Sequence, residues 1–109
     1  SKKNKIYILS QSNIKIGYIR FNIFKSRSCF VSIYLKKKKR SNNLGSIYLN
    51  HLLNIAKNKL NIKNVYAEVL KKNAFSKFFF LKNKFKLIKY SNKFKSIFDK
   101  KNHIFLRKI

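Results

Sequence analysis

The stretch from Cys29 to Ser46, CFVSIYLKKKKRSNNLGS, decides the expected fold of this chain. Its first part, Cys29–Leu35, is apolar and rich in β-branched side chains, which predicts a strand buried on both faces. From Ile47 onward, apolar residues recur at helical spacing. The polar loop between them contains Gly45, one of the two glycines of the chain. The stretch therefore predicts a strand, a sharp turn and a helix in direct succession.

A turn of this kind places unpaired amides at the start of a helix. The N–H groups of the first helical turn have no partner within the helix, and the helix dipole makes that end positive. A strand–loop–helix joint therefore favours the binding of an anion such as a phosphate. The segment Arg40–Ser46, RSNNLGS, is expected to supply these amides.

The composition bounds the class of protein. A chain of 109 residues is long enough for one domain with its own core. The hydrophobic fraction of 45% excludes a disordered tail. No apolar run has the length of a membrane span, and no signal-peptide pattern opens the chain. The single cysteine, Cys29, cannot form an internal disulfide. This suits a reducing compartment, so we expect a cytoplasmic protein.

The charge of the chain is extreme, but two explanations compete for it. The formal net charge is +26, with Glu68 and Asp99 as the only acidic residues. Such a field would hold RNA or DNA through the phosphates alone. However, the dominant residue types (Lys, Asn, Ile, Phe, Tyr and Leu) can all be encoded by codons made only of A and T. Pro and Trp are absent, as a strongly AT-biased genome would produce. The charge by itself therefore does not indicate a function.

The rest of the pattern predicts an α+β fold. Strands are expected at 5–9, 14–24, 29–35, 65–70, 85–89 and 103–108, and helices at 46–60 and 74–82. The alternation in 14–24 is irregular, which a bulge near Arg20 or Phe21, or burial of both faces, would explain. The segment from Cys29 to Leu70 should form a right-handed crossover between parallel strands. We therefore expect a mixed, mostly antiparallel sheet with a central strand–helix–strand crossover and a second short helix, in a single domain over residues 1–109.

Two motifs in this chain resemble those of the GNAT superfamily of N-acetyltransferases. The loop is similar to the family's pyrophosphate motif, Arg/Gln-x-x-Gly-x-Gly/Ala. Arg40 and Gly45 match it, and Asn43 stands at the first glycine, where Asn tolerates positive φ best among the other residues. The later family motif has Asn, a Ser or Ala three residues on, aromatic pairs and Lys-x-Gly-Phe. Asn73, Ser76 and the residues up to Phe85 resemble it. The resemblance covers about residues 16–90.

This resemblance implies a function and a set of contacts. It implies that acetyl-CoA is the co-substrate, with no metal, and that the acetyl group moves to a primary amine of an amino sugar, a peptide N-terminus or a small metabolite. In the family, two parallel strands diverge and the pantetheine arm enters the gap much as an added strand would. By resemblance, the main chain of Ile33 and Leu35 would contact this arm, with Asn73 and Ser76 on its other side. The loop would bind the pyrophosphate through Arg40, Ser41, Asn42, Asn43, Leu44, Gly45 and Ser46.

The chain also departs from the family pattern. Phe80 stands where the usual Tyr protonates the leaving thiolate, and Lys84 replaces the glycine of Lys-x-Gly-Phe. Tyr34 and Tyr66, on neighbouring strands, are the candidate substitutes for that proton donor. The N-terminal strand and helices that build the acceptor side in the family have no counterpart here. These departures predict a fragment, a clipped domain or a non-catalytic relic of the fold.

Glu68 is the candidate general base, because it lies on the strand beside the expected gap. A carboxylate there could deprotonate an incoming ammonium. The alternative that we favour is that Glu68 pairs with a lysine and orders the strand, since nearby positive charge lowers the pKa of a carboxyl group.

The remaining reactive or aromatic residues have simpler explanations. His51 and His103 have no second ligand at metal spacing and are expected at the surface. Cys29 is expected to be a small core residue. Phe75, Phe78 and Phe79 lie at helical spacing, so we expect them to pack in a core rather than to stack on nucleic-acid bases.

Three functions therefore remain. The first is an acetyl-CoA-dependent N-acetyltransferase, the second a small basic RNA- or DNA-binding protein, and the third a non-catalytic relic. An amide-lined loop at 42–46 would support the first. A continuous lysine surface without an apolar cleft would support the second. Phe80 and the missing N-terminal wall are what the third predicts.

Overall fold

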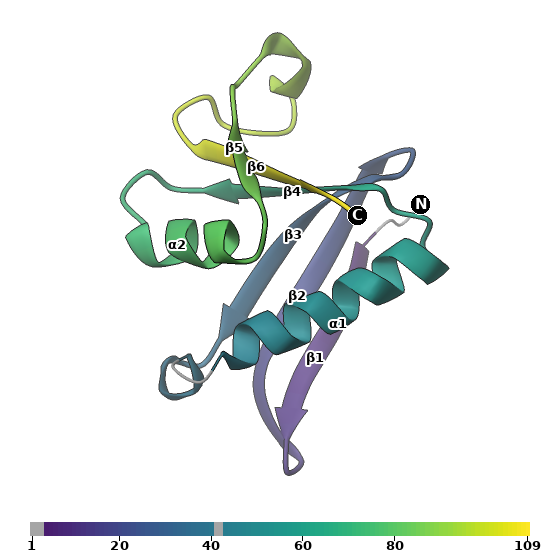
Figure 1. Ribbon diagram of the computed structural model, residues 1–109, viewed down its shortest axis with the longest axis vertical. Helices are drawn as coiled ribbons and strands as arrows, with labels where there is room; N and C mark the ends of the chain where they lie inside the picture. Colours follow the sequence, from purple (N-terminus) through teal and green to yellow (C-terminus); the bar gives the residue numbers. More distant parts are fainter. Residues whose placement is uncertain (1–3, 41–42) are drawn as a thin grey trace.

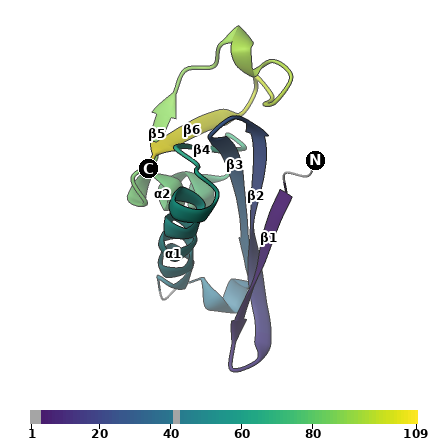
Figure 2. The ribbon, with the colours of Figure 1, turned by 90° about the vertical axis from the view of Figure 1, so that its right-hand side faces the viewer.

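The computed structural model describes residues 4–40 and 43–109 and confirms the predicted α+β class. Its six strands form one sheet in the order β1-β2-β3-β4-β6-β5, with α1 and α2 on one side (Figures 1 and 2). All neighbouring strands are antiparallel except β3 and β4, which are parallel. The bounds are β1 Asn4–Gln11, β2 Ile14–Lys25, β3 Ser28–Leu35, α1 Leu44–Lys59, β4 Asn64–Val69, α2 Ala74–Lys82, β5 Lys86–Ile88 and β6 His103–Lys108.

The crossover β3–α1–β4 is the predicted one. The apolar stripe of α1 is buried against the sheet through Leu49, Leu52, Leu53 and Ala56. α1 begins at Leu44, two residues earlier than the predicted start at Ser46, because Asn43 turns the chain in the left-handed region with φ 58°. The positive φ predicted as tolerable at Asn43 is therefore confirmed. Among the described residues, no helix is both long and apolar enough to cross a membrane.

The sheet carries a core on each face. The larger core lies between the sheet and the two helices. The smaller core lies on the opposite face, where the segment 91–102 covers the sheet. Its buried members are Tyr66, Phe94, Phe98 and Ile104, with Phe24 and Phe30 packed against them. β4 is therefore buried on both faces at Val65 and Tyr66.

The expected bulge near Arg20 or Phe21 is wrong. The register of β2 shifts instead near its two ends, where Ile16 is left over beside β1 and Phe24 beside β3. Between these points β2 pairs regularly with both neighbours, so side chains alternate strictly there. The alternative explanation, burial of both faces, holds locally, because Phe21 lies in the larger core and Phe24 packs on the smaller one.

The prediction that Phe75, Phe78 and Phe79 all pack in a core is also wrong. Phe75 is 57% exposed and Phe78 is 74% exposed. Phe79 is only partly buried, and the core residue of α2 is Phe80. Phe75, Phe78 and Phe79 share one face of α2, as their spacing predicts, but this face does not lie on the sheet, and Phe80 is turned by about 100° from Phe79. Phe80 is the one that meets the sheet, and its ring centroid lies 5.0 Å from that of Phe85.

Candidate functional site

The two parallel strands separate after a short paired region. β3 and β4 pair through Ser28–Asn64, Cys29–Val65 and Phe30–Tyr66, and within the described residues the pairing ends there. Figure 1 shows the strands diverging beyond this point. We call the paired residues 28–30 and 64–66 the closed end, and the segments 31–35 and 67–69 the open end. At the open end, the edge of β3 that faces β4 can bond to an extended ligand as to an added strand.

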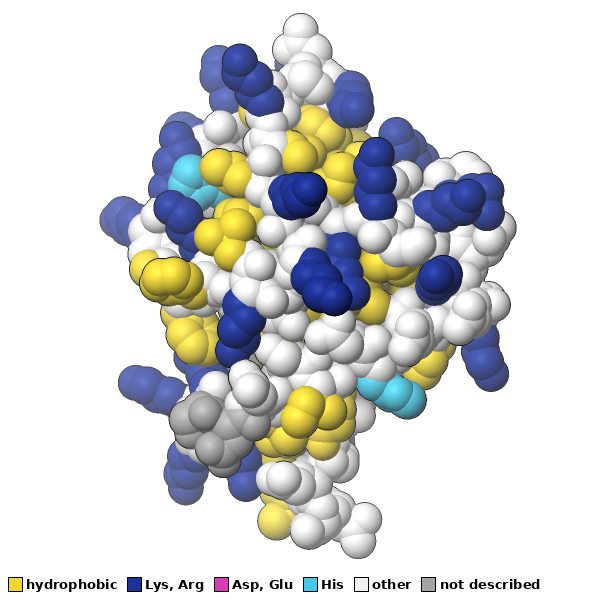
Figure 3. Space-filling model, in the orientation of Figure 1, with side chains coloured by type: hydrophobic (Ala, Val, Ile, Leu, Met, Phe, Trp, Pro, Cys, Tyr) yellow, Lys and Arg dark blue, Asp and Glu magenta, His cyan; other side chains and the backbone are white. Residues whose placement is uncertain are grey.

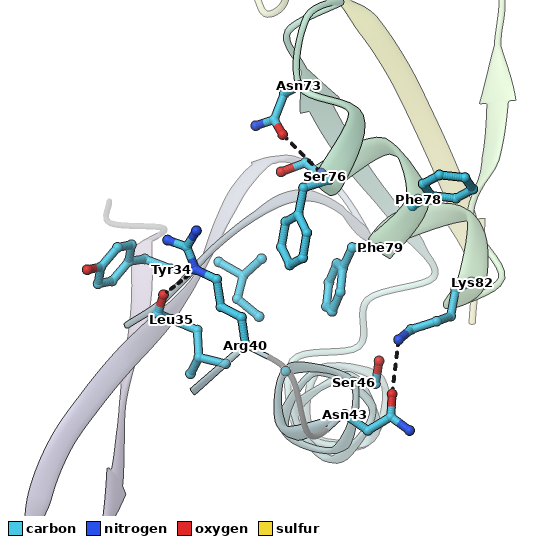
Figure 4. Close-up of a pocket in the computed structure, with 13 residues that line it drawn as sticks. Tyr34, Leu35, Arg40, Asn43, Ser46, Asn73, Ser76, Phe78, Phe79 and Lys82 are labelled. Atoms are coloured by element: carbon cyan, nitrogen blue, oxygen red, sulfur yellow. Dashed lines mark hydrogen bonds between the residues drawn. The ribbon is translucent and has the colours of Figure 1, made fainter. Parts of the chain in front are cut away.

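A cavity of about 490 Å³ lies at the open end (Figure 4). Its walls come from β3, from the loop before α1, from the start of α1, and from α2 with its preceding turn. The lining residues are Ile33, Tyr34, Leu35, Arg40, Asn43, Gly45, Ser46, Asn73, Phe75, Ser76, Phe78, Phe79 and Lys82. The structure therefore brings together most of the residues predicted from the two motifs, although these motifs lie far apart in the sequence.

The first turn of α1 forms the polar wall of the cavity. Asn43, in the left-handed region, accepts a hydrogen bond at its carbonyl from Ile47 N (3.0 Å) and so begins the helix. The side chain of Asn43 does not cap α1; its Oδ1 accepts a hydrogen bond from Lys82 Nζ at 2.9 Å. Because no acidic residue lies in this turn, the positive end of the helix dipole faces the cavity uncompensated. This wall can hold an anion.

Arg40 is held in place at the entrance of the cavity. Its Nε donates to the carbonyl of Leu35 at 2.8 Å. Its guanidinium carbon lies 5.8 Å from the ring centroid of Tyr34 and 5.8 Å from that of Phe75, so the cation lies within reach of aromatic rings from β3 and α2. Figure 4 shows Arg40 and Lys82 approaching the cavity from different sides. Two cations therefore accompany the helix amides.

Gly45 allows α1 and α2 to approach each other. A Cβ at this position would lie 3.1 Å from Cε1 of Phe79, closer than ordinary contacts. The glycine is thus favoured by packing and not by its backbone angle, because its φ is not positive. On the facing helix, Asn73 caps α2, with its Oδ1 accepting from Ser76 N at 3.0 Å.

A polar network fixes the two helices to β6. Asn83 is 5% exposed, and its Nδ2 donates to Ser46 Oγ (3.0 Å) and to the Phe79 carbonyl (2.8 Å). Its Oδ1 accepts from Asn50 Nδ2 at 3.0 Å, and Arg107 donates to Asn50 Oδ1 and to the Asn83 carbonyl. Burial lowers the pKa of Arg107. Because the network holds Ser46 and Phe79, it keeps the two cavity walls in register.

The structure separates the candidate proton donors. Tyr34 lines the cavity, but Figure 4 shows its hydroxyl directed away from the cavity. Tyr66 lies in the smaller core on the other face, where burial raises its pKa. Phe80, at the position of the family's acid, is 5% exposed and packs on Phe85 and Phe105. Of the two substitutes, only Tyr34 therefore reaches the cavity.

Glu68 lies on the opposite face of the sheet from the cavity, on the same side as Tyr66, and does not line the cavity. Its Oε2 accepts hydrogen bonds from the backbone N of Asp99 (2.7 Å) and from Asn102 Nδ2 (2.9 Å). The expected lysine partner is therefore replaced by groups of the segment 91–102. This segment covers the same face of β4, so its polar groups bond to the Glu68 carboxylate.

The other predicted residues have the following places. Leu44 packs partly against the larger core instead of lining the cavity. Ser41 and Asn42 lie outside the described residues. Among the described residues, no group of three or more His, Cys, Asp or Glu side chains could hold a metal ion. Cys29 is fully buried, and burial raises the pKa of its thiol to about 12, so it is not a nucleophile at neutral pH.

Sequence reasoning missed four lining residues, which are all on α2: Phe75, Phe78, Phe79 and Lys82. Lys82 stands at the Lys of the family's Lys-x-Gly-Phe motif, so the motif could have identified it as a site residue. Neither charge nor apolar character at the surface distinguishes this site from the rest of the visible face. Figure 3 shows Lys and Arg side chains spread over the whole of it with apolar patches between them.

The sequence profile of the acetyltransferase (GNAT) family matches residues 2–85. The chain belongs to the GNAT family. No curated protein sequence matches it at a significant level. The solved structures compared below are acetyltransferases or GNAT domains, and because their sequence identity to this GNAT chain is below 25%, the likeness shows the fold alone.

Three such structures illustrate the likeness. N-acetyltransferase PseH from Campylobacter jejuni, in complex with acetyl coenzyme A, has a TM-score of 0.77 and 23% identity over 99% of this chain and 70% of its own. PaiA N-acetyltransferase from Thermoplasma acidophilum, in complex with coenzyme A, has a TM-score of 0.82 and 20% identity over 98% and 62%. The GNAT domain of PAT from S. lividans has a TM-score of 0.84 and 13% identity over 98% and 61%. The chain thus spans less than two thirds of the second and third structures.

Proposed function

We propose that this chain binds acetyl-CoA in the cavity and transfers the acetyl group to a primary amine, in the cytoplasm. The observation that carries the proposal is the cavity at the open end of β3 and β4, which is bounded by the positive end of α1. This geometry suits a ligand with an extended amide-bearing arm and an anionic pyrophosphate. Two of the similar structures are complexes with acetyl coenzyme A and with coenzyme A.

The lining residues divide between the two parts of the cofactor. The pyrophosphate would lie against the amides of Asn43–Ser46, between the cations Arg40 and Lys82, which approach the cavity from different sides. Ser41 and Asn42 stay predicted partners in this loop. The pantetheine arm would bond to the main chain of Ile33 and Leu35. Asn73 and Ser76 would contact the arm from α2.

The reaction needs one bond to form and one to break. A neutral amine attacks the thioester carbonyl, and the C–N bond forms as the carbonyl oxygen becomes an oxyanion. Backbone N–H groups at the open end would stabilise this oxyanion. The intermediate then collapses with cleavage of the C–S bond, and the CoA thiolate takes up a proton. The amine loses one proton, and Glu68 is the predicted base for an amine that enters from the sheet face opposite α1 and α2, where this carboxylate lies. An amino sugar, a peptide N-terminus or a small metabolite would serve as the acceptor.

Calorimetry with acetyl-CoA at physiological salt tests the cofactor site. We expect micromolar binding by the wild type and its loss in an Asn43→Asp/Gly45→Glu variant, because anionic side chains would occupy the pyrophosphate position. Gly45→Glu also crowds Phe79, so this variant can lose binding through disturbed packing. A second pair of variants changes only the charge. Lys82→Gln removes a cation from the cavity, and Lys57→Gln removes an exposed one from α1. Only Lys82→Gln should weaken the binding of acetyl-CoA.

The opposite outcome is equally clear. Equal and salt-sensitive binding by the wild type and all variants would mean that lysines attract the phosphates from anywhere on the surface. The cofactor site would then be rejected in favour of the nucleic-acid alternative.

Two isosteric variants test the proposed chemistry. Glu68→Gln keeps an oxygen that can accept from Asp99 N and Asn102, so the fold should persist. We expect kcat to fall on the order of a hundred-fold because the base is lost. Tyr34→Phe keeps the ring next to Arg40 and removes the hydroxyl. We expect kcat to fall about ten-fold if that hydroxyl turns towards the thiolate and protonates it.

Steady-state kinetics with circular dichroism as the folding control gives both readouts. A Glu68→Gln variant with wild-type kcat would leave Glu68 with a purely structural role. A Tyr34→Phe variant with wild-type kcat would limit Tyr34 to holding Arg40 through its ring.

A further inference from the structure

The face of the sheet opposite α1 and α2 carries an arginine beside the open end. Ile19 and Phe21 point into the larger core, so Tyr18 and Arg20 point to the opposite face. On that face Arg20 pairs with Ser32 of β3, and Tyr18 pairs with Tyr34. The two tyrosine ring centroids lie 5.8 Å apart, and Tyr34 also lines the cavity. Arg20 is thus a diagonal neighbour of a cavity residue, about 7–8 Å away along the sheet.

Within the described residues, the buried Nε of Arg20 has no hydrogen-bond partner, whereas each of the other arginines donates a side-chain hydrogen bond. Its side chain is half-buried, and its Nε is buried without a partner among the described residues. The chain has three other arginines, and each donates a side-chain hydrogen bond: Arg27 to Asn61, Arg40 to Leu35 and Arg107 to Asn50. A buried guanidinium N–H without an acceptor is costly, and its best acceptor is a carboxylate or phosphate.

This protein cannot readily supply that acceptor from its own carboxylates. Glu68 and Asp99 are its only acidic residues. The Oε2 of Glu68 already accepts from Asp99 N and Asn102, and Asp99 Oδ1 accepts from Lys101 N (2.9 Å). Meanwhile the net charge of +26 repels a cationic acceptor molecule and attracts an anionic one. Among the described residues neither carboxylate bonds to Arg20, so a ligand is the remaining source of an anion for it.

We propose that the acceptor amine belongs to a molecule that also carries a phosphate or carboxylate group, and that Arg20 binds this group on the sheet face opposite α1 and α2. The inference rests on the proposed acetyl transfer. β2 and β3 are one strand spacing apart, and the open end lies on the other side of β3. The anionic group and the amine are therefore separated by one to two spacings, about 5–10 Å. A phosphorylated amino sugar or a short acidic peptide has this form.

Matched pairs of acceptors test the anionic group. At saturating acetyl-CoA and physiological salt, glucosamine is compared with glucosamine 6-phosphate, and Ser-Asn amide with Ser-Asp amide. The first pair isolates the phosphate and the second the carboxylate. Each pair is measured with the wild type, with Arg20→Gln and Arg20→Lys, and with Lys57→Gln. Lys57→Gln changes the net charge by the same amount as Arg20→Gln on the exposed side of α1.

We expect kcat/KM of the wild type to be at least ten-fold higher for the anionic member of one pair or both. Arg20→Gln should remove this preference through KM of the acceptor, with KM of acetyl-CoA unchanged. Arg20→Lys should restore part of it, and Lys57→Gln should behave as the wild type. Equal kcat/KM within both pairs, or equal losses in Arg20→Gln and Lys57→Gln, would overturn the proposal.

Calorimetric titration of the same acceptors keeps the test separate from acetyl transfer. If no acceptor is acetylated, tighter binding of glucosamine 6-phosphate than of glucosamine, lost in Arg20→Gln, would still support the anion site. Equal binding of the two sugars would overturn it. By contrast, failure of the wild type to bind acetyl-CoA would overturn the proposed function itself.

Discussion

The closed end and the open end of β3 and β4 belong to the same two strands, yet the strands pair with each other only at the closed end. At the closed end, both faces are covered: Cys29 and Val65 are fully buried towards the helices, and Tyr66 is 5% exposed on the other side. At the open end, Tyr34 is 45% exposed and Glu68 is also exposed. Backbone groups that are paired at the closed end are thus available to a ligand at the open end.

The difference follows from what packs around each end. The aromatic cluster of the smaller core packs over the closed end through Phe24, Phe30, Phe94 and Phe98. At the open end, Gly45 of α1 and Phe79 of α2 meet on the helix side and line the cavity together with Ile33. The apolar packing that holds the strands together at one end is thus replaced by a cavity at the other. A binding site can thus form where the side chains that pack on one end of a pair of strands are missing at the other end.

The largest effect is expected from Gly17→Ala, which deforms the open end from its far edge. Gly17 pairs with Leu35, and a Cβ there would lie 2.1 Å from the backbone oxygen of Tyr34. A backbone atom cannot move aside as a side chain can, so β2 and β3 must separate. We expect a loss of about 3 kcal/mol in the free energy of unfolding, measured by urea denaturation, with weaker acetyl-CoA binding.

Gly45→Ala is the matched control for Gly17→Ala. Its added methyl group would meet the side chain of Phe79 at 3.1 Å, and this ring can shift by a few tenths of an ångström. We expect a loss of about 1 kcal/mol. Equal losses in the two variants would show that β3 is not held rigidly at the open end.

Much of the fold was predictable because local patterns agree with the tertiary structure. The apolar stripe of α1 and the strand pattern of 29–35 match their burial. The turn at Asn43 was also predictable, since few residues other than glycine and asparagine adopt its φ. The two family motifs brought most of the cavity lining together, although no local pattern could show that α1 and α2 touch.

The rest depended on contacts between residues distant in the sequence. Which of the adjacent residues Phe78, Phe79 and Phe80 faces the core depends on Phe85, just before β5, and on Phe105 of β6, which pack against Phe80. The partners of Glu68 lie more than thirty residues away, in the segment 91–102. Arg20 gave no signal, because its missing partner is a property of the packed sheet.

An intermediate effect is expected at the closed end, where the stability should depend on pH through Cys29. Burial raises the pKa of this thiol from 9.0 to about 12. Below pH 9 the thiol is neutral in both states. Above it only the unfolded chain loses the proton, so stability is lost as the pH rises from 9 towards 12. At pH 10.5 we expect Cys29 to cost the folded state about 2 kcal/mol, from about 1.4 kcal/mol for each pH unit.

The measurement is the change in unfolding free energy between pH 8 and pH 10.5, for the wild type and for Cys29→Ala. Both proteins carry the same lysines, so deprotonation of the lysines cancels in the comparison. Identical changes in the two proteins would show that water reaches the thiol and that the closed end opens more than its packing indicates.

The smallest effect on the free energy of unfolding is expected from Lys84→Gly, in the turn after α2. This variant should change the stability without changing the binding of acetyl-CoA. Lys84 adopts φ 71° in the turn after α2, at the position where the family motif has glycine, and its side chain is exposed. The left-handed region costs an ordinary residue about 1–2 kcal/mol, whereas glycine avoids this cost and loses about 0.5–1 kcal/mol through its freedom in the unfolded chain. We therefore expect a net gain of about 0.5–1 kcal/mol.

Lys84→Ala is its control, because it removes the same charge and keeps the strained φ. Thermal unfolding should rise by a few degrees for glycine and stay unchanged for alanine, while both variants keep the wild-type affinity for acetyl-CoA. The affinity should not change because Lys84 lies outside the cavity lining. If Lys84→Gly instead weakened acetyl-CoA binding, the strained turn would be part of what positions α2 against the open end. The turn at Lys84 would then contribute to ligand binding as well as to stability.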